Sequence, residues 1–184
     1  MRIYVTGLGV VSGIGLSVAE NIASLRKHQH GMRKVTLFPT ELDVPVSEVK
    51  YSNEELKRLL SLDIQKTFSR TALLGMLAAR EAVDDARLDL KTLRVGLISS
   101  TSVGGMDLSE HFYNAFKKDN RKGRLREVIS HDCGASTEMI ADYLKINDFV
   151  TTISTACSSA ANAIMLGARM IRNGQLDAAI VGGT

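Results

Sequence analysis

The most constraining stretch of this sequence is a helical run near its end that has almost no polar face. Between Ala160 and Ile171 every residue is Ala, Ile, Met, Leu or Gly, except for one Asn and one Arg. A helix that is apolar on all sides lies inside a protein. Small residues such as Ala163 and Gly167 would let other elements pack closely against it. We therefore expect a buried central helix, which Gly174 ends.

Cys157 lies just before this helix, at the turn that follows an apolar, strand-like run over 149–154. The free amides and the dipole of a helix N-terminus favour negative charge, and so favour a thiolate over a thiol. Cys157 is therefore a candidate nucleophile. The alternative is that it is a small buried apolar residue, as most free cysteines are.

The rest of the chain alternates between strand and helix patterns. The run over 2–11 predicts a buried first strand, in which Gly7 and Gly9 indicate close backbone approach or a bulge. Capping motifs at Ser17 and Ser52 predict the start of two helices. The further expected elements are a helix over 64–86, a strand over 94–100, a small-residue loop over 101–105, helices over 106–118 and 136–144, and a last strand over 178–181. This order indicates a layered α/β domain with helices on both faces of a sheet.

The composition argues against nucleic acid and a membrane as partners of this chain. A net charge of +3, from 23 basic and 20 acidic residues, is too small to indicate nucleic acid. No apolar run is long enough to span a membrane, and we expect no signal peptide. With only two cysteines, nothing indicates an oxidising compartment, so the cytoplasm is the expected location.

The quoted motifs resemble one family of enzymes. The runs over 5–11 (VTGLGVV), 155–159 (TACSS), 163–174 (AIMLGARMIRNG) and 179–183 (AIVGG) resemble the β-ketoacyl-acyl carrier protein synthases. This resemblance implies a thiolase-like fold with a layered mixed sheet. It further implies that residues 1–184 form the N-terminal domain, with the C-terminal half of the enzyme lying outside this chain.

The resemblance also implies a chemistry for Cys157. Its thiolate would take an acyl group from acyl carrier protein, and a malonyl thioester would lose carbon dioxide and attack the acyl-enzyme. This is a decarboxylative Claisen condensation, as in fatty acid, polyketide or aryl-polyene biosynthesis. The substrates would ride on the phosphopantetheine arm of the carrier, and we expect no other cofactor and no metal. A backbone amide at Cys157 would serve as one oxyanion donor.

Further positions follow from the same resemblance. Val103, before Gly104 and Gly105, would line the acyl channel, and the strand over 149–154 would pair two subunits of a homodimer. Since acyl carrier protein is acidic in relatives, a basic cluster is a candidate docking surface, the alternative being a solvated loop. Its central members are Lys117, Lys118 and Arg121, while Lys66 and Arg70 are weaker candidates.

Two catalytic histidines and a lysine of the family lie in its second half, so we expect this chain alone to be inactive in condensation. One alternative is a partner subunit resembling a chain-length factor, which keeps the fold without condensing. Another is a different cysteine-dependent acyltransferase or thioesterase. That alternative would need a histidine of this chain near Cys157, and the candidates are His28, His30, His111 and His131.

Overall fold

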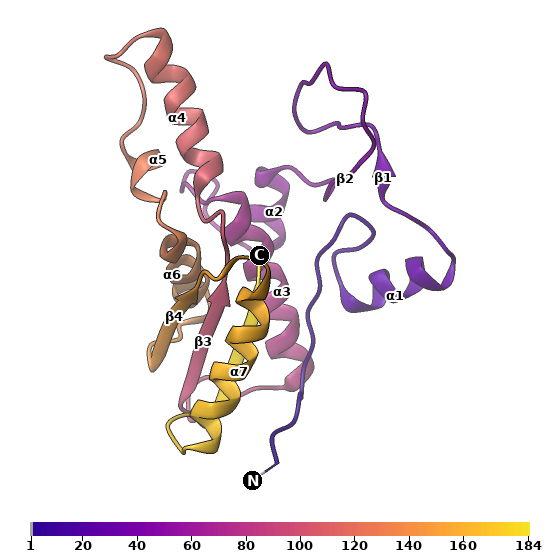
Figure 1. Ribbon diagram of the computed structural model, residues 1–184, viewed down its shortest axis with the longest axis vertical. Helices are drawn as coiled ribbons and strands as arrows, with labels where there is room; N and C mark the ends of the chain where they lie inside the picture. Colours follow the sequence, from indigo (N-terminus) through magenta and orange to yellow (C-terminus); the bar gives the residue numbers. More distant parts are fainter. Residues whose placement is uncertain (1) are drawn as a thin grey trace.

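The computed structural model of the protein describes residues 2–184, which are arranged around a three-stranded sheet (Figure 1). Strand β3 (Val95–Ser100) lies in the middle, between β4 (Phe149–Ile153) and β5 (Ala178–Gly183). Every residue of β3 is buried, as expected for a parallel strand that is covered on both faces. The predicted α/β class is confirmed.

The sheet is parallel throughout, so the expectation of a mixed sheet is wrong for this chain. Leu97 of β3 lies opposite Val150 of β4 on one side and Ile180 of β5 on the other, and all three strands run in the same direction. Within the described residues, the named strands that pair antiparallel are β1 (Met32–Arg33) and β2 (Val46–Ser47), which form a separate ribbon.

Side chains of β3 alternate between two packing layers. Val95 and Leu97 belong to a core shared with helices α3 (Arg70–Ala86) and α6 (Cys133–Leu144). Ile98 points the other way, into a smaller core formed with helix α7 (Ser159–Arg172). Since successive side chains of a strand point to opposite faces, this alternation puts α3 and α6 on one face and α7 on the other (Figure 1). The prediction of helices on both faces is confirmed.

Helix α7 packs closely on the sheet through its small residues, but only one side of it is buried. A Cβ atom added at Gly167 would lie 2.7 Å from Cγ1 of Val181, and Ala163 is fully buried. The outer side carries Ile164 and Met165, which are 56% and 45% exposed. Complete burial of this helix is therefore a wrong expectation for residues 2–184, because no element among them covers its outer side.

The predicted first strand over 2–11 is also wrong, because this segment pairs with no other strand. It runs in an extended form beside α3 (Figure 1). The Leu8 amide donates to Asp85 of α3 and the Val10 amide to Glu81, both at 3.0 Å. Acidic side chains of a helix thus satisfy backbone donors that a neighbouring strand would satisfy in a sheet.

The glycines of this segment do approach another backbone closely, as predicted. A Cβ atom added at Gly7 would lie 2.2 Å from the Ala82 carbonyl oxygen, and one at Gly9 only 1.8 Å from that of Ala78. Larger residues would therefore push the segment off α3. Several apolar side chains of the segment stay exposed, namely Tyr4, Val5, Leu8 and Val10.

Most helix starts follow from capping side chains. Ser52 and Glu55 form the complete capping box at the start of α2 (Asn53–Leu59). Ser69 caps α3, so that helix begins at Arg70 rather than at residue 64 as predicted, and Asp132 starts α6 three residues before the predicted 136. The remaining helices are α1 (Val18–Arg26), α2 (Asn53–Leu59), α4 (Met106–Lys118), the unpredicted α5 (Arg126–Ile129) and the short 3-10 helix η1 (Ala156–Ser158). None of the helices in residues 2–184 combines the length and apolarity needed to cross a bilayer.

Candidate active site

The carboxyl ends of the three parallel strands meet at one edge of the sheet. After β3 the Thr101 amide donates to the Ile153 carbonyl of β4 at 3.3 Å, and the Thr184 amide donates to the Ser100 carbonyl at 3.0 Å. The turn that carries Cys157 and the loop after β3 therefore leave the sheet from the same edge, where the C-terminus also lies (Figure 1). In parallel α/β sheets, ligands gather at this edge.

Cys157 lies in η1, and its side chain is solvent-exposed. The residue before it, Ala156, has a φ of +51°, in the left-handed region that residues with a Cβ rarely adopt. Such a conformation costs about 1–3 kcal/mol and persists only where the surrounding structure holds it. The backbone therefore turns sharply at the point where the thiol is presented. The exposure of Cys157 also contradicts the alternative of a small buried apolar residue.

Three polar side chains from the start of α7 hold this turn. Ser159 Oγ accepts from the Thr155 amide and donates to the Ala156 carbonyl, both at 2.7 Å. Asn162 Nδ2 donates to Thr155 Oγ1 at 2.8 Å, and Ser158 Oγ donates to the Thr155 carbonyl at 2.8 Å. Sequence reasoning did not assign a role to these residues. Their only signal was polarity at the start of an otherwise apolar helix.

The N-terminus of α7 has no side-chain cap, a feature that it shares with α4 and α5. Ser17, Ser69 and Asp132 each accept a hydrogen bond from a first-turn amide of their helices, whereas Ser158, the N-cap of α7, makes no such bond. Backbone donors at a helix start favour negative charge. The site thus places an exposed thiol at the N-terminus of a helix.

Val103 lies at the same edge as Cys157, on the loop after β3. Its side chain is 52% exposed. The loop is shaped by Thr101 Oγ1, which accepts from the amides of Val103 and Gly104 at 3.2 and 3.1 Å. A Cβ atom at Gly105 would lie 1.9 Å from the Ser130 carbonyl oxygen, so this glycine is required by close packing. The acyl-channel role of Val103, Gly104 and Gly105 stays a prediction.

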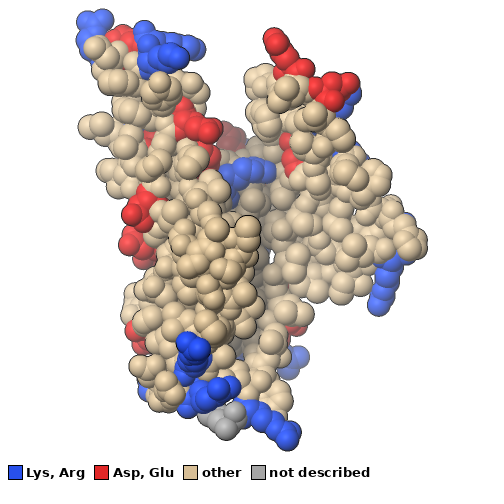
Figure 2. Space-filling view, in the orientation of Figure 1, with Lys and Arg blue, Asp and Glu red and all other residues tan. Residues whose placement is uncertain are grey.

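The predicted docking residues form a basic surface that is separate from the Cys157 turn. Lys117 and Lys118 end α4, and Arg121 follows, close to Asp119 at 3.3 Å. Figure 2 shows Lys and Arg side chains gathered at this end of the molecule. A helix rises about 1.5 Å per residue, so the 13 residues of α4 carry these charges well beyond the sheet edge.

Of the weaker docking candidates, Arg70 has a structural role instead. Its guanidinium donates to the carbonyls of Val49 and Tyr51 and to Asn53 Oδ1, at 2.6, 2.9 and 3.0 Å. Burial lowers the pKa of Arg70, while the nearby carboxylates of Glu48 and Asp107 oppose this shift. This side chain fastens the segment before α2 to the start of α3, so it is not available to a partner.

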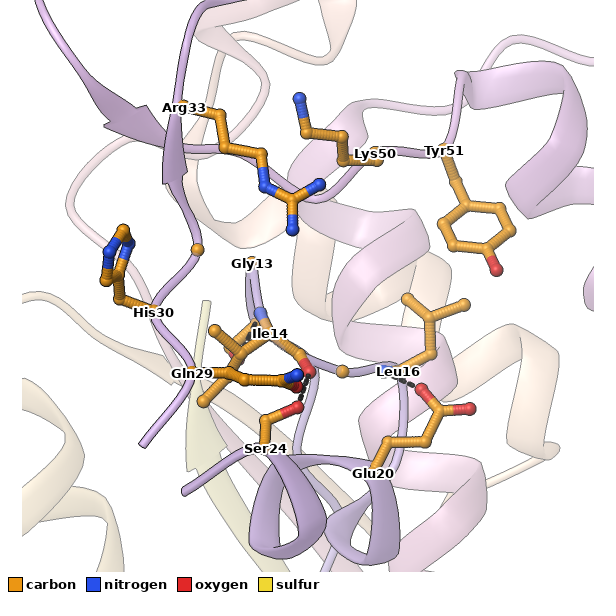
Figure 3. A pocket seen from close by; sticks show the side chains of 13 residues that line it. Gly13, Ile14, Leu16, Glu20, Ser24, Gln29, His30, Arg33, Lys50 and Tyr51 are labelled. Carbon is orange, nitrogen blue, oxygen red and sulfur yellow. Dashed lines mark hydrogen bonds between the residues drawn. The ribbon is translucent and has the colours of Figure 1, made fainter. Parts of the chain in front are cut away.

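No histidine of residues 2–184 hydrogen-bonds to Cys157. His111 Nδ1 lies 3.3 Å from Glu127 Oε2, and His131 Nδ1 lies 2.9 Å from Ser109 Oγ. His30 lines a pocket elsewhere (Figure 3). This arrangement gives no support to a hydrolase with its base inside the chain. Within the same residues, no three His, Cys, Asp or Glu side chains are placed to hold a metal ion.

Two cavities were not anticipated from the sequence. The one in Figure 3 lies between the turn at 13–16 and the side chains of Arg33, Lys50 and Tyr51, and of the candidate residues His30 lines it. A larger one, of about 560 Å³, has Phe68 and Tyr143 among its walls together with Lys66 and Arg126. Of the walls of the second cavity, Lys66 had been predicted, as a weaker docking candidate.

Comparison with known proteins identifies relatives over the full chain. The 3-oxoacyl-acyl-carrier-protein synthase 2 of Coxiella burnetii is 28% identical over 193 residues, covering 100% of this chain and 45% of that protein. The chain thus spans about half the length of the curated relatives it matches. Two solved structures are similar. The ishigamide ketosynthase/chain length factor has a TM-score of 0.86, with 29% identity over 97% of this chain and 46% of its own. The ketosynthase ApeO with its chain length factor ApeC, from Xenorhabdus doucetiae, has a TM-score of 0.75, with 25% identity over 98% of this chain and 46% of its own.

These similarities agree with the fold. The family described as "Beta-ketoacyl synthase, N-terminal domain" matches residues 1–184. A cysteine at the strand-to-helix turn, the small-residue helix behind it and the Gly-Gly end of β5 occur in the order that the sequence motifs predicted. The chain therefore belongs to the β-ketoacyl synthase family and carries its N-terminal domain.

Proposed function

We propose that the complete protein is a β-ketoacyl-acyl carrier protein synthase and that Cys157 is its nucleophile. The thiolate attacks the carbonyl of an acyl thioester, and the carrier leaves as a free thiol. A malonyl thioester then loses carbon dioxide, and the resulting carbanion attacks the acyl-enzyme. This forms the new carbon–carbon bond and releases the Cys157 thiolate. The observation that carries the proposal is an exposed thiol on a strained turn at an uncapped helix start.

We further propose that residues 1–184 alone load an acyl group but do not condense it. Condensation needs a group that stabilises the carbanion and the enolate oxygen, and no histidine among residues 2–184 hydrogen-bonds to Cys157. The exposed outer side of α7, with Ile164 and Met165, supports a further domain packed there in the whole enzyme. The catalytic histidines would come from that domain.

Incubation of the purified chain with a short acyl thioester and malonyl carrier tests both statements. Intact mass is expected to show one acyl group on the chain, and chromatography is expected to show no β-ketoacyl product. Full turnover would contradict the requirement for additional residues. Absence of any acyl adduct would contradict the assignment of Cys157 as nucleophile.

A non-condensing subunit resembling a chain-length factor is the second candidate. Two of the similar structures contain a chain length factor by their descriptions, so the fold alone is compatible with that role. Such partners lose the nucleophile, and this chain has Cys157 at the turn. The acyl-loading experiment separates the two, because a chain-length factor would stay unmodified.

We propose that acyl carrier protein docks on the basic surface formed by Lys117, Lys118 and Arg121. Replacing all three with Glu should weaken carrier binding by about tenfold or more at low salt, because complementary charge drives such encounters. A matched control reverses Arg26, Lys27 and Lys34, which lie on and after α1. Binding measured by fluorescence anisotropy should be nearly unchanged in the control. Equal affinity of both variants would mean that the basic surface is a solvated loop and does not bind the carrier.

We also propose that two copies of the protein form a homodimer through the strand over 149–154. Strand β4 is an edge of the sheet, since the strand order is β4–β3–β5, and Val150 is 38% exposed. An edge strand offers unpaired backbone groups to a second copy. Sedimentation of the purified chain would give a monomer if this edge does not pair.

A further inference from the structure

We propose that Ser159 is a positioning residue that keeps Ala156 left-handed and thereby sets the direction in which Cys157 presents its thiol. The proposal rests on the proposed function, since it concerns the reactivity of that thiol. It assigns to the residue two places after Cys157 a role distinct from packing.

The first step is that Ala156 needs an external restraint. Its φ of +51° is unfavourable for a residue with a Cβ. Without a partner that selects this state, the Thr155–Ala156 backbone would relax toward an ordinary region. Cys157 follows immediately, so such a relaxation would rotate its Cα–Cβ bond relative to α7.

The second step is that Ser159 is the side chain placed to supply this restraint. It is 5% exposed. Its Oγ holds the backbone on both sides of the strained residue, accepting from the Thr155 amide and donating to the Ala156 carbonyl, both at 2.7 Å. Ser158 differs, because it is exposed and bonds to Thr155, through the carbonyl and Oγ1, and to Asn162 Nδ2, but not to the Ala156 carbonyl.

The third step links the turn to reactivity. The thiolate gains from the amides at the start of α7 only if the sulfur is held near them. Ser159 belongs to α7 and binds the backbone before Cys157, so it locks the turn to the helix whose amides matter. Loss of its hydroxyl would free the turn while leaving Cys157 and the helix in place.

The test measures alkylation of Cys157 by iodoacetamide in the purified chain, with peptide mapping to separate Cys157 from Cys133. Ser159→Ala is expected to slow alkylation of Cys157 by roughly tenfold, as the strained turn relaxes. Ser24→Ala, the matched control, removes a hydroxyl of α1 that donates to the Ile14 carbonyl at 2.8 Å, away from the Cys157 turn, and is expected to stay within about twofold of wild type. An unchanged alkylation rate at Cys133 would show that the variant keeps the fold.

A second substitution distinguishes positioning from simple loss of a buried hydrogen bond. Glycine adopts positive φ without strain, so Ala156→Gly added to Ser159→Ala should restore most of the lost rate. A wild-type rate in Ser159→Ala, or no recovery in the double variant, would overturn the proposal. If the rates behave as expected but the wild type never accepts an acyl group, the positioning role stands and the proposed nucleophile role fails.

Discussion

Replacing Cys157 with alanine is expected to abolish acyl transfer from a thioester to this protein. The acyl-enzyme bond forms on sulfur, and Cys157 is the exposed one of the two cysteines. The measurement is intact mass after incubation with a short acyl thioester, followed by peptide mapping. The wild type should gain one acyl group on the peptide that contains Cys157, and Cys157→Ala should gain none.

The chain provides its own matched control for this experiment. Cys133 is the other cysteine, half-buried at the first position of α6. Cys133→Ala should load as the wild type does, because α6 begins with a side-chain cap from Asp132 and the Cys133 thiol has no assigned role. Acylation that survives in Cys157→Ala and disappears in Cys133→Ala would move the active site to α6.

Ile98→Ala is expected to produce the largest loss of stability among single substitutions near the site. Ile98 is fully buried in the centre of β3, and its Cδ1 lies 3.5 Å from where a Cβ atom at Gly167 would be. Truncation of a buried Ile to Ala costs about 2–5 kcal/mol of unfolding free energy, compared with about 5–15 kcal/mol in total for a typical domain. Urea unfolding should show this difference.

The effect should concentrate on α7. The core between β3 and α7 has four buried apolar residues. Because the outer side of α7 is exposed, little else holds this helix. Hydrogen exchange in Ile98→Ala should therefore speed up in α7 more than in α3. Leu73→Ala, at an equally buried position on the other face, is the control and should affect α3 first. Equal loss of protection in both helices would contradict this division.

Much of the fold was predictable because its signals are local. The caps at Ser17 and Ser52, the small residues of α7 and the apolar run of β3 depend on neighbours in the chain or on the period of one element. The start of α3 was predicted too early, since an apolar pattern does not show which of several serines acts as the cap.

The candidate site was predictable in part. Cys157 was predicted to be a candidate nucleophile from its motif and its place before a helix. The structure places it on an exposed turn, where a substrate can reach the thiol. The contacts of Ser159 with both sides of Ala156 were not predictable, since they depend on a positive φ that no residue type announces at an alanine. Arg70 appeared as a surface charge in the sequence, yet it is used within the fold.

By itself, the sequence determined the α/β class and the family and pointed to the cysteine that we propose as nucleophile, because short motifs and the periodicity of single elements carry this information. Only the tertiary structure decided which surfaces are covered. The segment over 2–11 and the outer side of α7 both look like interior in the sequence, and both are exposed within residues 2–184. Apolar character expresses a preference for burial, but burial requires a partner element in space, and the residues that would supply one are not adjacent in the chain.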